Sequence, residues 1–585
     1  MTWYTSVAGA ADEGVSTNSA NANNMGIAVD PSGAIVGCGT FSSLTATVGS
    51  GTRTNVTLSN PFGGGAAGTT AGYVTRMSNS GSLLWAASLT GTGVGVNQGF
   101  SGCTTDAAGN VIVTGSFRNT GVFAGNSTSL GGVFIPAVNV SALMANGYAD
   151  AFLAKLNSAG TFQWIQPVAG NTDDFSYAIA TDPFAGHSYM GGVITGTGAT
   201  TFGTGPSALA LPTTPLSAFV TKVYTSGQHA WSVMFGSTGT VGTPDTVYGL
   251  AVDGVTGDVL ATGATSGPTG TYGPVAGTLT SVVNGQTGTN DAFIVRIDNG
   301  GNIRWAAILG SVANDVGYGA AFDNAGNIAV CGTYDTAPVL FNGADTGLPP
   351  PMAGLTAGYL LKLSASGSLL FALSFSGSDV VTPQSVVFTP AGEPVVTGFY
   401  NLGSATFGYP DPGALVLTAL MPSQTAFIVK ASPSGTLRWG TSLGNNAAGA
   451  VAYDTYSGAL VATGVLGDRP SLFGDAAVAR SQGFLFSQGG NDAWVAKIWA
   501  CAPGKTPNAT GCGYCPGGYY CPGGAVSYPC GYGFYCPVGA SAPVSCGLGL
   551  ITLSDRATSC VFPPPPPSPP PPPSPPPPPP PPPPR

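Results

Sequence analysis

The feature that most constrains the fold is a unit of short apolar segments that recurs seven times within residues 1–500. In one copy, the segments are GAAFD (319–323), GNIAVCGTY (326–334), GYLLKL (358–363) and LLFALSF (369–375). Turns containing Gly separate the segments, and across the copies the third segment follows a longer connection that is commonly rich in Gly, Ser and Thr. Alternation, β-branched residues and Gly, Asn and Asp turns predict β-strands, with no convincing helical periodicity.

Radial repetition of four-stranded units is typical of a β-propeller. The first segment of each unit is rich in small residues, which suits the crowded central axis, and the third carries an aromatic predicted to fill the space between sheets. There are seven copies of the first three segments but only six fourth segments after them. The segment TWYTSVAG (2–9) supplies the seventh. The predicted fold class is all-β: a closed seven-bladed β-propeller over residues 1–500, with an N-terminal strand completing the last blade. The alternative is an open array of β units.

The stretch DAFIVRIDNGGNIRWAAILGSVANDVGYGAAFDNAGNIAVCGTY (291–334) resembles the bacterial-type β-propeller repeat family. The resemblance covers roughly residues 1–500 and implies the fold without implying a reaction, because propellers host many activities.

Composition excludes several functional classes. Only 7% of the residues are charged and the net charge of -9 is spread thinly, so a nucleic-acid partner, which needs a basic face, is not expected. No apolar run is long enough for a transmembrane helix. No signal peptide is visible either. For an extracellular protein, the true start would then lie upstream of Met1; the alternative is a cytosolic chain with reduced cysteines.

A cysteine-rich module is predicted at residues 501–560, where few apolar residues are available for a core. Four disulfides are expected, because the zinc alternative lacks a second CxxC pair or a nearby His. The eight cysteines are Cys501, Cys512, Cys515, Cys521, Cys530, Cys536, Cys546 and Cys560. The twice-repeated CPxGxYC unit in 515–539 resembles the ephrin-receptor-like cysteine-rich module, which implies an extracellular connecting or binding role.

Residues 561–585 form a proline tail whose PPPPPSPPPPP pattern predicts a stiff polyproline II rod. The pattern resembles the hydroxyproline-rich glycoproteins of green-algal and plant extracellular matrices, which implies a cell-wall location and modified prolines. Candidate N-glycosylation sites, which give weak support for secretion, are Asn55, Asn126, Asn139 and Asn508. The remaining cysteines, Cys38, Cys103 and Cys331, are predicted to be buried thiols.

Catalytic chemistry is poorly supplied. The chain has only two histidines, His187 and His229, so a Ser–His–Asp triad is not expected. Loops entering the first strands carry carboxylates that could bind a cation such as Ca²⁺, although Asp also commonly caps such turns. These weak candidates are Asp173, Asp174, Asp245, Asp315 and Asp379. Each third segment also carries one basic residue, predicted to pair with the acid that ends the first segment of its unit.

The sequence therefore predicts a secreted or cell-surface glycoprotein with a structural or adhesive role in an extracellular matrix. The propeller would be a head that binds a matrix protein or glycan, without enzymatic activity or a cofactor. Two alternatives stay open. One is a propeller-type polysaccharide lyase or hydrolase, which would need paired carboxylates converging in a cleft. The Asp loops above are the candidates, and loss of activity on substitution of Asp245 and Asp315 would support this alternative. The other is the ectodomain of a larger membrane receptor.

Overall fold

The computed structural model divides the chain into two compact units. One comprises Met1–Ala500 with Pro507–Gly511, and the other comprises Cys501–Thr506 with Cys512–Arg585. The structure describes residues 3–9, 25–50, 56–61, 69–91, 98–118, 121–124, 138–140, 148–196, 198–213, 217–237, 245–266, 270–272, 278–279, 289–352, 354–409, 414–419, 424–445, 447–466, 471–472, 484–485, 492–498, 505–508, 511–520, 528–531, 534–540, 542–546, 550, 552, 554 and 556–561.

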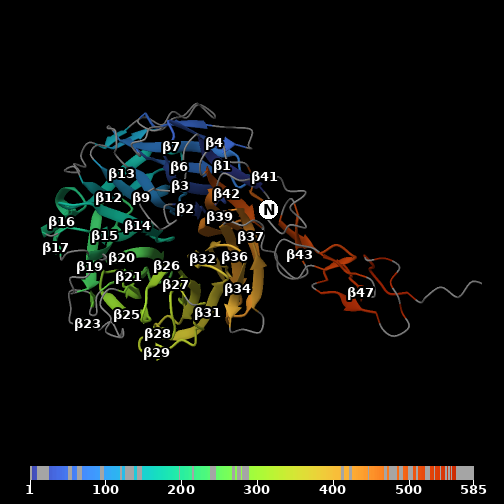
Figure 1. Ribbon diagram of the computed structural model, residues 1–585. Helices are drawn as coiled ribbons and strands as arrows, with labels where there is room; N and C mark the ends of the chain where they lie inside the picture. Colours follow the sequence, from blue (N-terminus) through green and yellow to red (C-terminus); the bar gives the residue numbers. More distant parts are fainter. Residues whose placement is uncertain are drawn as a thin grey trace, which may run out of the picture. The chain divides into compact units, whose positions relative to one another are not determined.

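The first unit is a seven-bladed β-propeller, which confirms the predicted fold (Figure 1). The innermost strands gather around the centre of the ring. They are β2 (Gly26–Val29), β8 (Gly99–Thr105), β14 (Asp174–Thr181), β20 (Thr246–Val252), β26 (Asp315–Phe322), β32 (Val381–Phe388) and β38 (Ala448–Asp454). The second strands are β3 (Ile35–Phe41), β9 (Val111–Arg118), β15 (Ser188–Ile194), β21 (Val259–Thr265), β27 (Ile328–Tyr334), β33 (Pro394–Tyr400) and β39 (Ala459–Leu466).

The outer half of each blade contains two further antiparallel strands. The third strands are β6 (Ala71–Met77), β12 (Ala149–Leu156), β18 (Ser217–Val223), β24 (Asp291–Ile297), β30 (Ala357–Leu363), β36 (Thr425–Ala431) and β42 (Asp492–Ile498). The fourth strands are β7 (Leu83–Gly91), β13 (Phe162–Ala169), β19 (His229–Ser237), β25 (Ile303–Gly310), β31 (Leu369–Gly377), β37 (Leu437–Asn445) and β1 (Trp3–Gly9). The third-strand aromatics are all buried between sheets, as predicted: Tyr73, Phe152, Phe219, Phe293, Tyr359, Phe427 and Trp494.

The N-terminal strand closes the ring. Strand β1 pairs with β42 of the last blade over five positions, from Trp3 opposite Lys497 to Val7 opposite Ala493. The first and last parts of the propeller chain therefore share one sheet, which gives the last blade its outer strand. Hydrogen bonding across this junction satisfies strand edges that would otherwise be open.

Six of the seven sheets have six strands rather than the four expected. The connection between the second and third strands of a blade forms a hairpin, and this hairpin pairs with the outer strand of the preceding blade. The hairpins are β4 (Thr45–Ser50) with β5 (Val56–Ser59), β10 (Gly121–Ala124) with β11 (Val138–Val140), β16 (Gly198–Phe202) with β17 (Leu209–Thr213), β22 (Gly270–Tyr272) with β23 (Thr278–Leu279), β28 (Leu340–Phe341) with β29 (Ala344–Asp345), and β34 (Ser404–Tyr409) with β35 (Leu415–Thr418). A seventh, β40 (Ser471–Leu472) with β41 (Phe484–Leu485), forms its own two-stranded sheet. Each added hairpin covers an outer edge and links neighbouring blades.

A set of buried basic residues forms clamps between blades. Lys497 pairs with Asp454 of its own blade at 2.7 Å and also contacts Asn79 in the first blade. Arg296 pairs with Asp253 at 2.7 Å and donates to the Ala365 carbonyl of the following blade. Equivalent ion pairs are Arg76–Asp30, Lys155–Asp106, Lys362–Asp323 and Lys430–Glu393. The predicted pairing is therefore present in five blades. In the blade whose first segment ends in Thr389 rather than Asp, Lys430 pairs with Glu393, just before β33, instead.

The third-strand base of the remaining blade departs from this pattern. Lys222 contacts Asn299 of the next blade rather than forming a direct ion pair with Asp182, the acid that ends its own inner strand. Lys222 thus still links its blade to the next one, although its hydrogen-bond partner is the Asn299 amide rather than a carboxylate.

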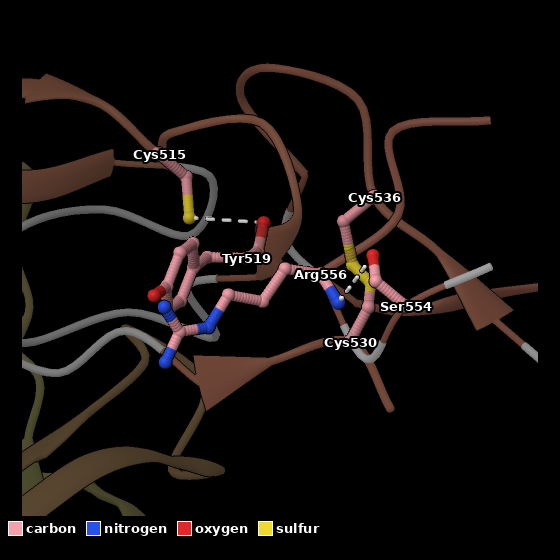
Figure 2. The surroundings of a disulfide bond; sticks show 6 residues. All are labelled: Cys515, Tyr519, Cys530, Cys536, Ser554 and Arg556. Atoms are coloured by element: carbon pink, nitrogen blue, oxygen red, sulfur yellow. Dashed lines mark hydrogen bonds between the residues drawn. A yellow bond between two sulfur atoms is a disulfide. The ribbon is translucent and has the colours of Figure 1, made fainter. Parts of the chain in front are cut away.

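The second unit contains short strands and disulfides, one of which, Cys530–Cys536, is drawn in Figure 2. Cys530 bonds to Cys536 and Cys546 bonds to Cys560. Its paired strands are β45 (Tyr519–Tyr520) with β46 (Tyr528–Pro529), and β47 (Phe534–Tyr535) with β48 (Val544–Ser545); β43 (Lys505–Asn508) pairs with β44 (Gly511–Tyr514) at the boundary of the two units. Figure 2 shows the Arg556 guanidinium beside the Tyr519 ring. It lies 5.2 Å from the ring centre. Covalent bonds and a cation–π contact stabilise a segment that has little apolar core.

Candidate functional site

The candidate site is a cavity on the propeller axis. Its volume is about 150 Å³, and residues of all seven inner strands or their immediate flanks line it. Figure 1 shows the labelled inner strands β2, β14, β20, β26 and β32 converging on this axis. Every blade contributes two or three consecutive residues to the lining, and one equivalent position recurs in all seven blades.

A β-bulge selects these side chains. In six inner strands the register with the second strand shifts over one residue, which is left without a Cα partner. The extra residues are Ser101, Tyr177, Tyr248, Tyr318, Gln384 and Gly449, and Met25, just before β2, takes the seventh place. All seven line the cavity. Bulges re-aim side chains and are common next to functional sites.

A glycine in the second strand permits each bulge. At Gly263, an added Cβ would lie 1.8 Å from the Thr246 carbonyl oxygen and 2.8 Å from the Phe293 ring. Only a residue without Cβ lets the inner strand approach this closely. The same clash with an inner-strand carbonyl occurs at Gly115, Gly192, Gly332, Gly398 and Gly464. The recurrent second-strand glycine is therefore a requirement of the cavity geometry.

Three tyrosines form an aromatic arc on one side of the cavity. The rings of Tyr177 and Tyr248 have centroids 5.6 Å apart, and those of Tyr248 and Tyr318 are 5.7 Å apart. The Phe175 ring stacks on the Tyr177 ring, with 6.2 Å between their centroids. Burial raises the pKa of Tyr177, and it raises the pKa of Tyr318 to about 12, so these rings stay neutral phenols near pH 7. The name tyrosine arc is used below for Tyr177, Tyr248 and Tyr318.

The opposite side of the cavity is small and neutral. Glycine, alanine and serine dominate there. Gln384 belongs to the blade that follows the Tyr318 blade, and its Oε1 is buried and accepts no hydrogen bond. Among the described residues that line this cavity, none has a charged side chain. The cavity thus combines aromatic faces with one unsatisfied acceptor, as is common where a protein orients a small neutral ligand.

The carboxylates that the sequence singled out lie elsewhere. Asp245 is buried and accepts a hydrogen bond from the Ser266 amide at 2.9 Å, and Asp315 accepts from the Ser311 amide and hydroxyl at 2.6 and 2.8 Å. Asp173 pairs with Arg118 at 2.8 Å, and the half-buried Asp379 accepts from the Val380 amide at 2.6 Å. These four, like Asp174, do not line the axial cavity. Cation binding by these residues stays a prediction; among the described residues no group of three or more His, Cys, Asp or Glu side chains is arranged to hold a metal.

Sequence reasoning named Asp174 and Asp315 but missed two buried carboxyls that interact with their groups, Asp150 and Asp291. Burial, followed by the charges of Asp174 and Asp173, raises the pKa of Asp150 to about 7. Burial likewise raises the pKa of Asp174 to about 7, despite backbone hydrogen bonds that oppose the shift. At another junction, burial raises the pKa of Asp315 to about 8, and hydrogen bonds from Ser311 oppose this shift more strongly than the charge of Asp291 adds to it. The Asp that begins several third segments was the sequence signal that could have identified these buried carboxyls.

The remaining predicted residues are partly described. Cys515 is disulfide-bonded, in addition to the two disulfides above, and its Sγ lies 3.3 Å from the Tyr519 carbonyl oxygen (Figure 2). Cys501 and Cys521 lie outside the described residues, as do Asn55 and Asn126; Cys512, Asn139 and Asn508 lie on β44, β11 and β43. Cys38, Cys103 and Cys331 are buried free thiols, as predicted.

Comparisons with known proteins support a propeller repeat but supply no activity. No family model matches the chain. It is 22% identical, over 424 residues, to an uncharacterized WD repeat-containing protein of Acanthamoeba polyphaga mimivirus. The match covers 62% of this chain and 30% of that relative's length. A crystal structure of a protein of unknown function from Bacteroides caccae aligns at 11% identity over 49% of this chain and 89% of that one, with a TM-score of 0.22; at that score the alignment has no bearing on the fold or function.

Proposed function

We propose that this protein is a secreted or cell-surface glycoprotein with a structural or adhesive role in an extracellular matrix. Its propeller is a non-catalytic head that binds a protein or glycan partner at the face where the axial cavity opens. The observation that carries the binding role is the cavity itself, which seven blades line with neutral side chains and which holds a tyrosine arc. Propellers that present such axial sites are suited to binding because the ring is rigid.

The disulfides support the extracellular location. Cys530–Cys536 and Cys546–Cys560 join residues in a unit with a very small apolar cluster, and such bonds persist in oxidising compartments. The proline-rich composition after residue 562 agrees with a matrix protein, since modified polyproline rods act as stiff spacers. The relative in the mimivirus carries WD repeats in its name, which is compatible with a scaffold that binds other proteins.

A lyase or hydrolase would need acid and base groups facing a substrate. The carboxylates considered for that role, Asp245 and Asp315, are buried and hydrogen-bonded to the Ser266 and Ser311 amides, and the described residues that line the cavity include no Asp, Glu, His, Lys or Arg. We therefore favour binding over catalysis.

Peptide mass spectrometry of the protein from its native source tests this proposal. We expect disulfides among Cys501–Cys560, glycan at one or more of the four Asn sequons, and hydroxylated, pentose-bearing prolines after residue 562. Free thiols throughout 501–560 together with unmodified prolines would place the protein inside the cell and contradict the proposal.

A further inference from the structure

The tyrosine arc offers three ring surfaces at one site. Tyr177, Tyr248 and Tyr318 come from three successive blades, and each sits at a bulge that turns it toward the axis. Their centroid spacings of 5.6 and 5.7 Å make the arc continuous. Aromatic faces with partial negative charge attract polarised C–H groups, so a ligand with an apolar, C–H-bearing face fits this surface.

The rest of the cavity requires a ligand that also donates hydrogen bonds. Gln384 is 5% exposed, and its Oε1 has no partner. A buried acceptor without a donor is costly, and a ligand hydroxyl or N–H at this position would remove the cost. The ligand must therefore combine an apolar face with at least one donor.

Charge and size narrow the ligand further. The residues lining the cavity carry no charge, so an ionised ligand would be desolvated without compensation. The volume of about 150 Å³ accommodates a single six-membered ring with its substituents, and not an extended peptide. A proline-rich segment would offer rings for stacking, but proline has no N–H to donate to Gln384. A neutral sugar meets all of these conditions, because one ring carries both C–H faces and hydroxyl donors.

We propose that the axial cavity binds one neutral pyranose residue, such as the end of a glycan, with the sugar face on the tyrosine arc and a hydroxyl donating to Gln384 Oε1. This inference rests on the proposed binding function and names the ligand class for the same site. Uronic acids, sulfated sugars and phosphosugars are excluded as ligands, because their charge would be buried without a partner.

Saturation-transfer difference NMR on the full-length chain tests the inference. The probes are the methyl glycosides of D-glucose, D-galactose, D-mannose and L-arabinose, with D-glucuronate as the charged comparison. We expect saturation transfer to the C–H protons of at least one neutral sugar and none to glucuronate. Gln384→Met, which keeps the volume and removes the acceptor, should weaken binding about tenfold. Tyr248→Leu, which removes the central ring of the arc, should weaken it at least as much.

Tyr456→Leu is the matched control, because Tyr456 is 69% exposed and lies outside the cavity; it should bind sugar as the unsubstituted chain does. Unfolding temperatures of all three variants identify any loss caused by misfolding, and Gln384→Met keeps the test valid if Tyr248→Leu does not fold. The inference is overturned if no neutral sugar gives a signal, if sugar binding survives both cavity substitutions, or if an oligoproline peptide binds in a manner that Tyr248→Leu abolishes.

The proposed function would survive a negative sugar result. Retention of the full-length chain on native matrix measures partner binding irrespective of the ligand class. Loss of sugar binding with intact retention would refute only the sugar inference, whereas loss of both would refute the proposed function as well.

Discussion

The clamp at ring closure provides a sharp test of the architecture. The side chains of Lys497 and Asp454 are only 2% and 0% exposed. Their ion pair lies in the blade that the N-terminal strand completes. Replacing Lys497 by Met leaves a buried carboxylate without its cation. Removing one partner of a buried pair costs about 3–5 kcal/mol. The Tyr456 and Ser457 amides donate to Asp454 independently of Lys497, so the carboxylate should keep part of its hydrogen bonding in the variant.

A matched control exists in the neighbouring blade. Lys430 pairs with Glu393 at 3.0 Å, but the Glu393 side chain is 23% exposed and can turn toward water when its partner is removed. We expect Lys430→Met to cost clearly less than Lys497→Met. The Lys497→Met/Asp454→Asn double variant should recover much of the loss, because no buried charge then remains.

Hydrogen exchange measured by mass spectrometry reports the local stability of the strands at the ring closure. A loss of about 3–5 kcal/mol corresponds to a roughly 10²- to 10⁴-fold faster exchange of the amides in β42. Strands in blades far from the junction, such as β20, should change much less. Equal effects of Lys497→Met and Lys430→Met, or an unchanged exchange rate in β42, would refute the closure reasoning.

Three further predictions follow from buried groups. The pKa of Asp315 is about 8 in the folded chain and 3.8 in the unfolded chain, so the free energy of unfolding should fall as pH rises between these values. In urea titrations, Asp315→Asn should flatten that part of the pH profile. An unchanged slope would contradict the raised pKa. Gly263→Ala should destabilise the propeller by about 1–3 kcal/mol or more, because the added Cβ would overlap the Thr246 carbonyl oxygen. Gly37→Ala, whose added Cβ has its nearest atom at 3.4 Å, should cost less. Equal unfolding midpoints for the two variants would contradict the claim that the bulge requires glycine at position 263. Cys38 and Cys331 are buried and do not line the axial cavity, so they should react with a thiol reagent only after denaturation; their rapid labelling in the native chain would contradict their burial.

The blade strands were accessible to sequence reasoning because their signals are local. Aromatics such as Phe152 and Phe293 repeat at one position of the third strand, and TWYTSVAG has the pattern of a fourth strand. The hairpins were not predicted, since their Gly-, Ser- and Thr-rich sequences alternate weakly and their partners belong to another blade. Strand pairing over such distances depends on the assembled ring rather than on local propensity.

The cavity was missed because its residues differ in type. Tyr177, Tyr248 and Tyr318 each stand five positions before the Asp that ends the first segment, and Ser101 and Gln384 occupy the same place in other copies. This five-residue spacing is visible in the sequence, but the face of the strand on which these side chains lie is not, because the bulge changes which face a side chain occupies. Reasoning from charge instead pointed to Asp residues, of which Asp174, Asp245 and Asp315 proved to be buried within the blades.

Retention of the full-length chain on extracellular matrix isolated from the source organism tests the central claim most directly. The account predicts saturable retention that excess unlabelled protein competes away and that a chain denatured by heat does not show. Retention no greater than that of the heat-denatured chain, across salt concentrations that preserve the fold, would contradict a structural or adhesive role.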